Sequence, residues 1–327
     1  MYLVTGGAGF IGSNIVAELA GRGDPVVVCD WMRSDERWRN LCKHELVDLI
    51  APEALMEWLN AKPRQLRAVL HMGAISATTE TDVDLIIRLN IRATLDLLDW
   101  CTRSGTAFIY ASSAATYGDG AAGFGDEFSV EALAKLRPLN AYGWSKHVVD
   151  RRVARLVADG AAVPPQWVGL KFFNVYGPNE YHKGSMQSVV ARNYEPVRDG
   201  APMRLFRSYR PEYADGGQLR DFIYVKDCVA VILWLLEQPK VSGLFNVGSG
   251  KARSWLDLAT ALLRACDRQP QVEFIDMPAT LIDKYQYFTQ AHMERLRRAG
   301  FAQPFTSLEE GVTDYVQRYL ATADRYR

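Results

Sequence analysis

The sequence predicts an α/β protein built on a doubly wound parallel sheet, with helices on both faces of that sheet. Short apolar segments alternate with segments of helical periodicity through the first half of the chain. These short segments are apolar almost throughout, as in strands that are buried on both faces. A glycine-rich turn directly follows the first of them. With 327 residues, 48% of them hydrophobic, the chain is long enough to bury a large core.

The elements of the first half follow from this alternation. Strands are expected at Tyr2–Thr5, Pro25–Asp30, Ala68–Met72, Ala107–Ser112 and Trp167–Phe173. Helices are expected between them, at Ile11–Arg22, Pro52–Leu59, Asp82–Ser104 and Ala141–Ala158. Strands separated in this way by helices must run parallel, because each helix carries the chain back across a face of the sheet.

The pattern changes after Phe173 to loops rich in Pro, Gly, Tyr and Arg. Strands are expected there at Phe222–Val225 and Leu244–Val247, and helices at Cys228–Glu237, Trp255–Cys266 and Leu308–Thr322. No flexible linker separates the two halves. The expected organisation is a domain at residues 1–173, rejoined by roughly residues 220–243, and a smaller interwoven α/β lobe made mainly of residues 174–327.

Composition excludes several classes of function. Lys and Arg together number 38 and Asp and Glu together number 38, so no excess of positive charge points to a nucleic acid or to a membrane surface. The five cysteines are scattered and include no CxxC pair, which predicts reduced thiols and no metal site. No apolar stretch reaches the roughly 20 residues that cross a bilayer, and no leader is expected, because no basic region followed by an apolar stretch stands at the N-terminus. A cytoplasmic location is expected.

The glycine-rich turn predicts a dinucleotide site. Gly6, Gly9 and Gly12 follow the first strand at intervals of three residues and open the first helix. Glycine permits the tight turn and the close approach of the backbone to a ligand. The helix N-terminus then directs free N–H groups and the positive end of its dipole at a pyrophosphate. We therefore expect residues 1–173 to form a Rossmann-type nicotinamide-binding domain.

Asp30, at the end of the second strand, is relevant to the choice between NAD and NADP. An acidic residue there accepts hydrogen bonds from the adenosine ribose of NAD. Arg33, Arg37, Arg39 and Lys43 follow closely, and guanidinium groups bind the 2′-phosphate of NADP bidentately. The electrostatics of this segment are therefore compatible with either cofactor.

A hydroxyl, a phenol and an ammonium group make up the candidate catalytic set. Ser113 directly follows the fourth expected strand, and Tyr142 and Lys146 lie four residues apart at the start of a helix, hence on one face. An ammonium group beside a phenol favours the phenolate and lowers the pKa of Tyr142, which suits it to acid/base work. Ser113 is expected to orient and polarise a carbinol or carbonyl oxygen.

The glycine turn, the serine and the Tyr-Lys pair, in this order, resemble the extended short-chain dehydrogenases/reductases of the NAD-dependent epimerase/dehydratase family, over essentially the whole chain. Further segments resemble one branch of that family, the ADP-L-glycero-D-manno-heptose 6-epimerases. They lie at residues 71–80, 112–118, 173–178, 182–186, 220–222 and 285–290. The His-Lys-Gly-Ser-Met segment at residues 182–186 separates this branch best from other nucleotide-sugar epimerases.

The resemblance implies a redox-neutral inversion at C6 of the heptose in a nucleotide sugar, a step in making the lipopolysaccharide core precursor. It assigns the two acid/base roles to Tyr142 and Lys183, with Ser113 positioning the oxygen and Lys146 tuning Tyr142. It also implies bound NADP and a homo-oligomer. Taken without the resemblance, Lys183 fits a solvated loop lysine better than a catalytic group.

The resemblance also assigns the binding residues position by position. With the glycines, the cofactor-site residues are Gly6, Gly9, Phe10, Ile11, Gly12, Asp30, Trp31, Arg33, Arg37, Met72, Gly73, Ala74, Ile75, Ser76, Asn90, Tyr142, Lys146 and Val175. The substrate-site residues are Asn174, Ser185, Arg192, Phe206, Arg207, Ser208, Tyr209, Arg220 and Tyr285. Arginines suit the diphosphate, and the rings of Phe206 and Tyr285 suit stacking on adenine.

The sequence departs from this branch in three places. Trp31 stands where the family has Asn, Pro52 replaces a lysine, and the segment Phe206–Leu219 is longer than in the family. The first two leave NAD open beside NADP, for which Arg33 and Arg37 are the candidate 2′-phosphate ligands. The longer segment leaves open a substrate with a different sugar or a different nucleotide.

Other readings remain. A UDP-hexose 4-epimerase would share most of these motifs. A dehydratase carries an Asp-Glu pair after the active-site hydroxyl, where this chain has Ala114 and Ala115. A non-catalytic NADP-binding regulatory protein has no need of intact Ser113, Tyr142 and Lys146. We therefore predict a nucleotide-sugar 6-epimerase.

Overall fold

The larger part of the protein is a seven-stranded parallel sheet, which confirms the predicted fold class. The computed structural model describes residues 1–61, 66–282 and 285–327. The strand order is β10-β6-β5-β4-β1-β2-β3. The strands are β1 (Tyr2–Thr5), β2 (Val26–Cys29), β3 (Asp48–Ile50), β4 (Ala68–His71), β5 (Ala107–Ser113), β6 (Trp167–Phe172) and β10 (Gly243–Val247).

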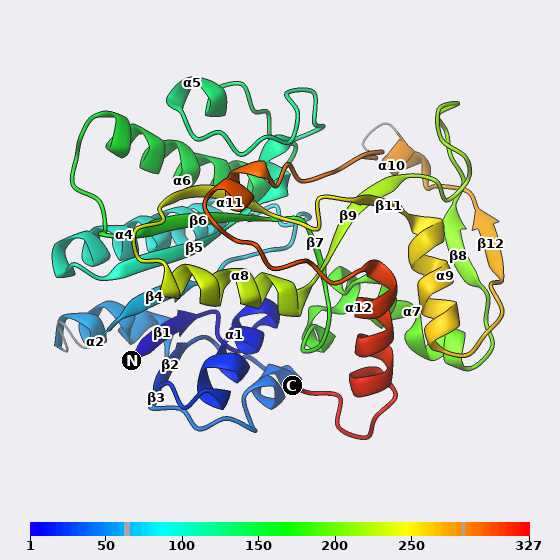
Figure 1. Cartoon of the computed structure of the whole chain (residues 1–327), viewed down its shortest axis with the longest axis horizontal. Helices are drawn as coiled ribbons and strands as arrows, with labels where there is room; N and C mark the ends of the chain where they lie inside the picture. The colour runs from blue at the N-terminus through cyan, green and yellow to red at the C-terminus, as the bar shows by residue number, and fades with distance from the viewer. Residues whose placement is uncertain (62–65, 283–284) are drawn as a thin grey trace.

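Helices cover both faces of this sheet (Figure 1). On one face lie α1 (Phe10–Gly21) and α8 (Val225–Glu237), which pack against each other. On the other face lie α4 (Ala93–Ser104) and α6 (Ala141–Ala158), which pack on β5. Every residue of β1, β2, β4, β6 and β10 is therefore buried, which explains their continuous apolar sequences.

Two expected helices are built differently from the prediction. The segment expected as one helix from Asp82 to Ser104 contains α3 (Val83–Ile86), a π-helical turn η3 (Ile87–Arg92) and α4. The segment expected at Pro52–Leu59 starts with the 3₁₀ turn η2 (Pro52–Ala54) and continues as α2 (Leu55–Ala61). Periodicity does not distinguish these turns from a continuous α-helix, because they change the pitch only locally. The π-helical turn carries Asn90.

The rest of the chain forms a smaller lobe, at the right in Figure 1. One small sheet has the order β11-β9-β7, with β7 (Asn174–Tyr176), β9 (Leu219–Tyr224) and β11 (Ala252–Ser254). A second pairs β8 (Met203–Phe206) with β12 (Val272–Ile275). The strand expected at Phe222–Val225 is β9, which belongs to this lobe. The chain returns to the large sheet through α8 and β10.

The helices of the smaller lobe share a second apolar core, around Leu262 and Val312. They are α7 (Val189–Arg198), α9 (Trp255–Ala265) and α12 (Leu308–Tyr315), which continues as the π-helical η6 (Val316–Leu320). The remaining short elements are η1 (Glu36–Asn40), η4 (Ala114–Tyr117), α5 (Val130–Leu133), η5 (Tyr181–Met186), α10 (Ala279–Ile282) and α11 (Glu294–Arg298).

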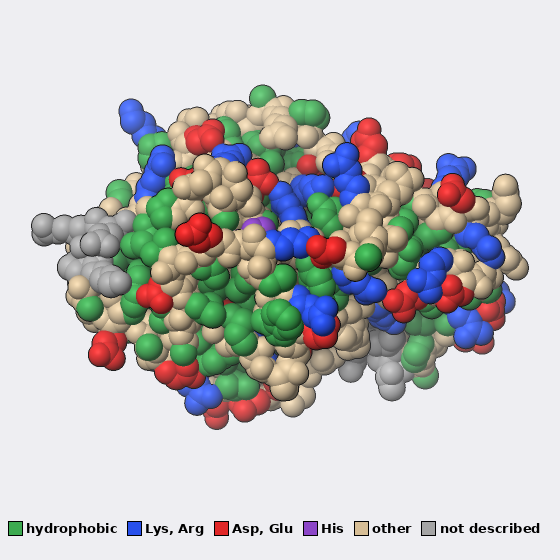
Figure 2. Space-filling model, turned by 90° about the horizontal axis from the view of Figure 1, so that it is seen from below, with side chains coloured by type: hydrophobic (Ala, Val, Ile, Leu, Met, Phe, Trp, Pro, Cys, Tyr) green, Lys and Arg blue, Asp and Glu red, His purple; other side chains and the backbone are tan. Residues whose placement is uncertain are grey.

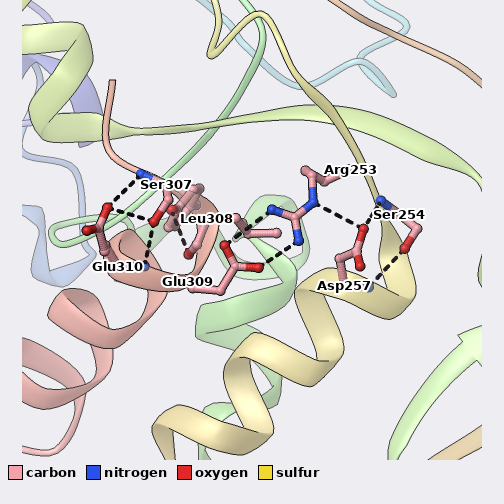
Figure 3. Close-up of polar contacts among 8 residues, drawn as sticks. Arg253, Ser254, Asp257, Ser307, Leu308, Glu309 and Glu310 are labelled. Atoms are coloured by element: carbon pink, nitrogen blue, oxygen red, sulfur yellow. Dashed lines mark hydrogen bonds and ion pairs between the residues drawn. The ribbon is translucent and has the colours of Figure 1, made fainter. Parts of the chain in front are cut away.

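The N-termini of α9 and α12 are each closed by a capping box, and Arg253 joins them (Figure 3). Ser254 Oγ accepts from the N–H of Asp257 at 2.9 Å, and Asp257 Oδ2 accepts from the N–H of Ser254 at 3.0 Å. Arg253 donates to Asp257 at 3.2 Å and to Glu309 at 2.6 Å. These contacts satisfy N–H groups that a helix start leaves free.

Ser254→Ala is expected to lower the free energy of unfolding by about 1 kcal/mol, because the capping hydroxyl is lost. Urea unfolding followed by circular dichroism measures this change. Ser254→Thr is the control, since it keeps the hydroxyl and should change stability much less. Equal losses in the two variants would show that the cap contributes little.

Among the described residues, no helix combines the length and the apolar character that crossing a membrane requires. On the face seen in Figure 2, Lys and Arg side chains gather near the middle with Asp and Glu side chains beside them and apolar side chains around them. The charge on this face is therefore mixed in sign.

Candidate active site

The glycine turn brings three backbone segments too close together for side chains. Gly6 has a φ of +65°, and a Cβ on it would lie 2.6 Å from the backbone N of Gly73. A Cβ on Gly12 would lie 2.1 Å from the carbonyl oxygen of Gly6. Helix α1 begins after Gly9, at Phe10 and Ile11, without a side-chain cap. Its first N–H groups are therefore available to an anion such as a pyrophosphate.

Asn90 holds the loop after β4, the predicted cofactor segment Met72–Ser76. Its side chain is fully buried, accepts from the N–H of Ile75 at 2.8 Å and donates to the carbonyl of Ile75 at 3.0 Å. It also donates to Ser145 Oγ at 3.1 Å, and Ser145 donates to the carbonyl of Tyr142 at 2.7 Å. One polar side chain thus links the predicted cofactor loop to the start of α6.

The carboxylate of Asp30 faces the glycine turn. It accepts from the N–H of Ala8 at 3.0 Å and from the N–H of Trp31 at 2.8 Å. Burial raises the pKa of Asp30, and the bond from Ala8 opposes that rise. The Trp31 indole donates to Glu53 at 2.8 Å, so the residue that departs from the family pattern is held by the segment around Pro52.

The two arginines expected to bind a 2′-phosphate differ in their environment. Arg37 donates twice to Asp35, at 2.8 and 2.7 Å, which lowers the pKa of Asp35 to about 2. Arg37 also opposes the rise in the pKa of Asp30, so its charge acts on the predicted ribose site. Arg33 is exposed, with a φ of +50°.

Ser113 and Tyr142 meet where α6 approaches the end of β5. Asn140 caps α6 by accepting from the N–H of Gly143 at 2.8 Å. A Cβ on Gly143 would lie 2.6 Å from the carbonyl oxygen of Ala115, so glycine allows the helix to pack on η4. A hydrogen bond from the Ser113 hydroxyl favours the Tyr142 phenolate, but burial of the phenol dominates and raises the pKa of Tyr142.

Lys146 lies one turn further along α6 and is buried. Burial lowers its pKa to about 8, and Asp150 opposes that fall. The sequence predicted that Lys146 lowers the pKa of Tyr142. The pKa of Tyr142 is instead raised, because the cost of burying a phenolate is larger than the stabilisation from its neighbours.

Lys183 is not a solvated loop lysine. It lies in η5, with Nζ 5.0 Å from the centroid of the Phe10 ring at the glycine turn. Burial lowers the pKa of Lys183, and Glu180 opposes that fall. Glu180 is fully buried and accepts from the Ser188 hydroxyl at 2.7 Å. Glu180 was not predicted as a site residue. An acid three residues before a candidate base, in a Gly-Pro loop, could have indicated it.

Arg220 is a buried cation among aromatic rings. It is 7% exposed and lies 5.2 Å from the Tyr285 ring centroid and 5.8 Å from that of Trp255. It donates to the carbonyls of Leu219 and Gln286, and burial lowers its pKa. Within the described part of the chain, no carboxylate forms an ion pair with it. A buried guanidinium without a counter-ion is suited to a diphosphate.

The other predicted substrate residues fall into two groups. Around Arg220, the rings of Phe206 and Tyr285 pack edge to face, with their centroids 6.2 Å apart. Asp215 accepts hydrogen bonds from the Arg207 side chain and from the N–H of Ser208. The Tyr287 hydroxyl accepts from the N–H of Tyr209. In the second group Arg192 donates to the carbonyl of Ser185 at 3.4 Å, beside a cavity of about 310 Å³. Asn174, the remaining predicted substrate residue, begins β7 and is followed there by Val175, a predicted cofactor residue. The sequence analysis missed Trp255 as a neighbour of this site.

The parallel sheet, the glycine turn at α1 and the Ser-Tyr-Lys arrangement define an extended short-chain dehydrogenase/reductase. Residues 2–248 match the model of the NAD dependent epimerase/dehydratase family. The chain belongs to this family, and the resemblance drawn from its sequence is confirmed.

Relatives share the whole length of the chain. An ADP-L-glycero-D-manno-heptose-6-epimerase of Nitratidesulfovibrio vulgaris (strain DP4) is 52% identical over 332 residues, 100% of both chains. One of Fusobacterium nucleatum is 46% identical over 335 residues, again 100% of both chains. The crystal structure of the Helicobacter pylori enzyme of that name is 29% identical, with a TM-score of 0.79 over 97% of this chain and 95% of that chain. Thermus thermophilus UDP-glucose 4-epimerase, crystallised with NAD, is 27% identical, with a TM-score of 0.73 over 96% and 97%.

Proposed function

We propose that this protein inverts C6 of the heptose in ADP-D-glycero-β-D-manno-heptose to give ADP-L-glycero-β-D-manno-heptose, an isomerase reaction that supplies a lipopolysaccharide core precursor. The observation that carries the proposal is the position of Lys183. A half-buried lysine with a lowered pKa at the glycine turn, additional to Tyr142 and Lys146, supplies the second acid/base that inversion requires. Full-length similarity to enzymes named for this reaction supports it.

The chemistry divides between the two lobes. A nicotinamide dinucleotide held at the glycine turn would supply a reversible hydride acceptor for C6, so the reaction would involve no net oxidation. Inversion requires that the ketone formed in between present both faces, so the oxygen must exchange its proton with a group on each side. In this proposal Tyr142 and Lys183 are those groups, Ser113 holds the oxygen, and Lys146 sets the charge around Tyr142.

The binding residues follow the same division. Residues 1–173, rejoined by about residues 220–243, hold the dinucleotide through the glycine turn, residues 72–76 and Asn90, and Val175 of the smaller lobe adds a further contact. Residues 174–327 hold most of the substrate. Arg220 binds the diphosphate, because it is a buried cation with no carboxylate partner among the described residues. Phe206 and Tyr285 stack on the adenine, and the further contacts come from Asn174, Ser185, Arg192, Arg207, Ser208 and Tyr209.

The experiment that tests this function is a direct assay of C6 inversion. ADP-D-glycero-β-D-manno-heptose is incubated with the purified protein, and the C6 configuration is scored by NMR, with UDP-glucose and UDP-N-acetylglucosamine in parallel. We expect inversion of the heptose only. Inversion of a UDP-hexose alone would refute the assignment and favour a UDP-hexose 4-epimerase.

We propose NADP as the resident cofactor, with Arg33 and Arg37 at its 2′-phosphate. The glycine turn and the half-buried Asp30 fit a nicotinamide dinucleotide, and the charge of Arg37 acts on Asp30. Denaturing the purified protein and identifying the released nucleotide distinguishes NADP from NAD. Release of NAD alone would overturn this choice.

The double variant Arg33→Ala/Arg37→Ala is expected to weaken NADP binding at least tenfold and to leave NAD binding nearly unchanged, because charge-assisted bonds to the 2′-phosphate each contribute about 1.5–3 kcal/mol. Isothermal titration of the cofactor-free protein measures both affinities. Arg39→Ala is the matched control, since Arg39 is exposed and pairs with Glu36. Equal weakening of both cofactors would exclude a specific role at the 2′-phosphate.

We also propose a cytoplasmic location and a homo-oligomer. Light scattering after size-exclusion chromatography measures the second, and a monomer at micromolar concentration would overturn it.

A further inference from the structure

A completely buried ion pair lies directly behind the catalytic set. Asp150 is on α6, one turn after Lys146, and Lys171 is on β6. Lys171 Nζ lies 2.6 Å from Asp150 Oδ2, and neither side chain is exposed to solvent. Burying two charges costs more free energy than burying apolar side chains of the same volume, so stability alone does not account for this pair.

Hydrogen bonds join this ion pair to residues on both sides of Ser113, at the end of β5. Asp150 accepts from the Ser112 hydroxyl at 2.7 Å and from the Tyr110 hydroxyl at 3.1 Å. Lys171 donates to Thr116 Oγ1 at 2.7 Å, and Thr116 in turn donates to the carbonyl of Ser113 at 2.8 Å. The residues before and after Ser113 are therefore tied to one pair of charges.

The same pair acts on Lys146. Asp150 favours the ammonium form of Lys146, whose pKa burial lowers to about 8. Lys171 neutralises part of the charge of Asp150. Burial lowers the pKa of His71 on β4 to about 3 and of His147 to about 4, and raises that of Tyr110 on β5. The positive charges of Arg137 and Arg151 act on His147. The charge that acts on the pKa of Lys146 is that of Asp150.

We propose that Asp150 and Lys171 form a positioning pair for the epimerase reaction, which holds Ser113 against Tyr142 and sets the charge state of Lys146. The pair acts through residues that carry the chemistry and touches no substrate. The proposal rests on the proposed function, because it takes Ser113, Tyr142 and Lys146 as the catalytic set.

Single substitutions of the pair should move the charge state of Lys146 in opposite directions. Asp150→Asn removes the anion that favours the ammonium, so the pKa of Lys146 falls. Lys171→Met leaves the anion without its partner, so the pKa of Lys146 rises. We expect each change to be about one pH unit. The alkaline limb of the kcat profile, where the ammonium of Lys146 is lost near pH 8 in the native protein, should follow, while KM changes little.

The test is an NMR titration of the Lys146 side chain in protein labelled with ¹⁵N-lysine, assigned by its loss in Lys146→Met. It uses no substrate, so it stands even if the heptose assay fails. Thermal unfolding is recorded for each variant. Opposite movements of the Lys146 pKa in the two variants support the proposal. An unchanged Lys146 pKa in both, with only a lower Tm, would overturn it and leave a purely structural ion pair.

Two further variants keep the test decisive if a single variant does not fold. Asp150→Asn/Lys171→Met removes both charges and leaves no unpaired ion, and its Lys146 pKa should lie between the values of the two single variants, because the two effects oppose each other. Lys171→Arg keeps the cation and should retain the native pH profile. A double variant with the same Lys146 pKa as the single variant that folds would contradict the proposal.

Discussion

Replacing Tyr142 by Phe and Lys183 by Met in one protein should abolish epimerisation. Each substitution removes an acid/base group with little change in volume, and each acid/base group contributes about 10²–10⁴-fold to the rate. The double variant should therefore lose at least about 10⁴-fold in kcat, and each single variant should lose a smaller factor. The measurement is C6 inversion by NMR, together with the content of bound nucleotide and the Tm.

The control for this pair is Lys240→Met, which removes an exposed lysine on the surface and should leave kcat unchanged. The bound nucleotide and the Tm of the double variant should stay close to those of the native protein, which separates lost chemistry from lost folding. Near-normal turnover in the double variant would refute the scheme with two acid/base groups.

Gly12→Ala should empty the dinucleotide site. A Cβ at Gly12 would lie 2.1 Å from the carbonyl oxygen of Gly6, and that atom belongs to backbone that cannot rotate away. The turn must open, so the N–H groups of α1 no longer converge on a pyrophosphate. We expect the nucleotide released on denaturation to fall to background, and the free energy of unfolding to fall by about 1–3 kcal/mol.

The matched control is Gly21→Ala at the other end of the same helix. A Cβ at Gly21 meets no atom within 4 Å, and alanine favours the helix by about 0.5–1 kcal/mol. Gly21→Ala should therefore retain its nucleotide and unfold at the same or a higher denaturant concentration. Full nucleotide content in Gly12→Ala would show that the turn tolerates a side chain and that the pyrophosphate lies elsewhere.

The parts of the candidate site that depend on local sequence could be predicted. Helix α6 runs over the predicted residues Ala141–Ala158, because its cap Asn140 and its apolar face are both local signals. The glycine turn was equally clear, since its spacing between a strand and a helix has a direct steric cause. The short strands β3, β8 and β12 were not expected, because edge pairing and partial exposure leave little apolar pattern in three or four residues.

Residues that act through distant partners could not be assigned in the same way. The sequence shows Lys171 as one polar residue in an apolar strand and Asp150 as one acid on a helix, and it does not bring them together. Arg37 was predicted as a candidate phosphate ligand, but not as the partner of Asp35. The pKa of Tyr142 was predicted in the wrong direction, because burial is a property of the packed chain.

The amino-acid sequence thus specifies the α/β fold, the glycine turn and the order of Ser113, Tyr142 and Lys146, because each depends on local spacing and periodicity. Tertiary packing decides what these groups can do. It buries Lys146, brings Lys183 from the smaller lobe to the ring of Phe10, leaves Arg220 without a carboxylate partner among the described residues, and joins Asp150 to Lys171. The reason is physical: electrostatic effects depend on distance and burial, which only the folded chain defines.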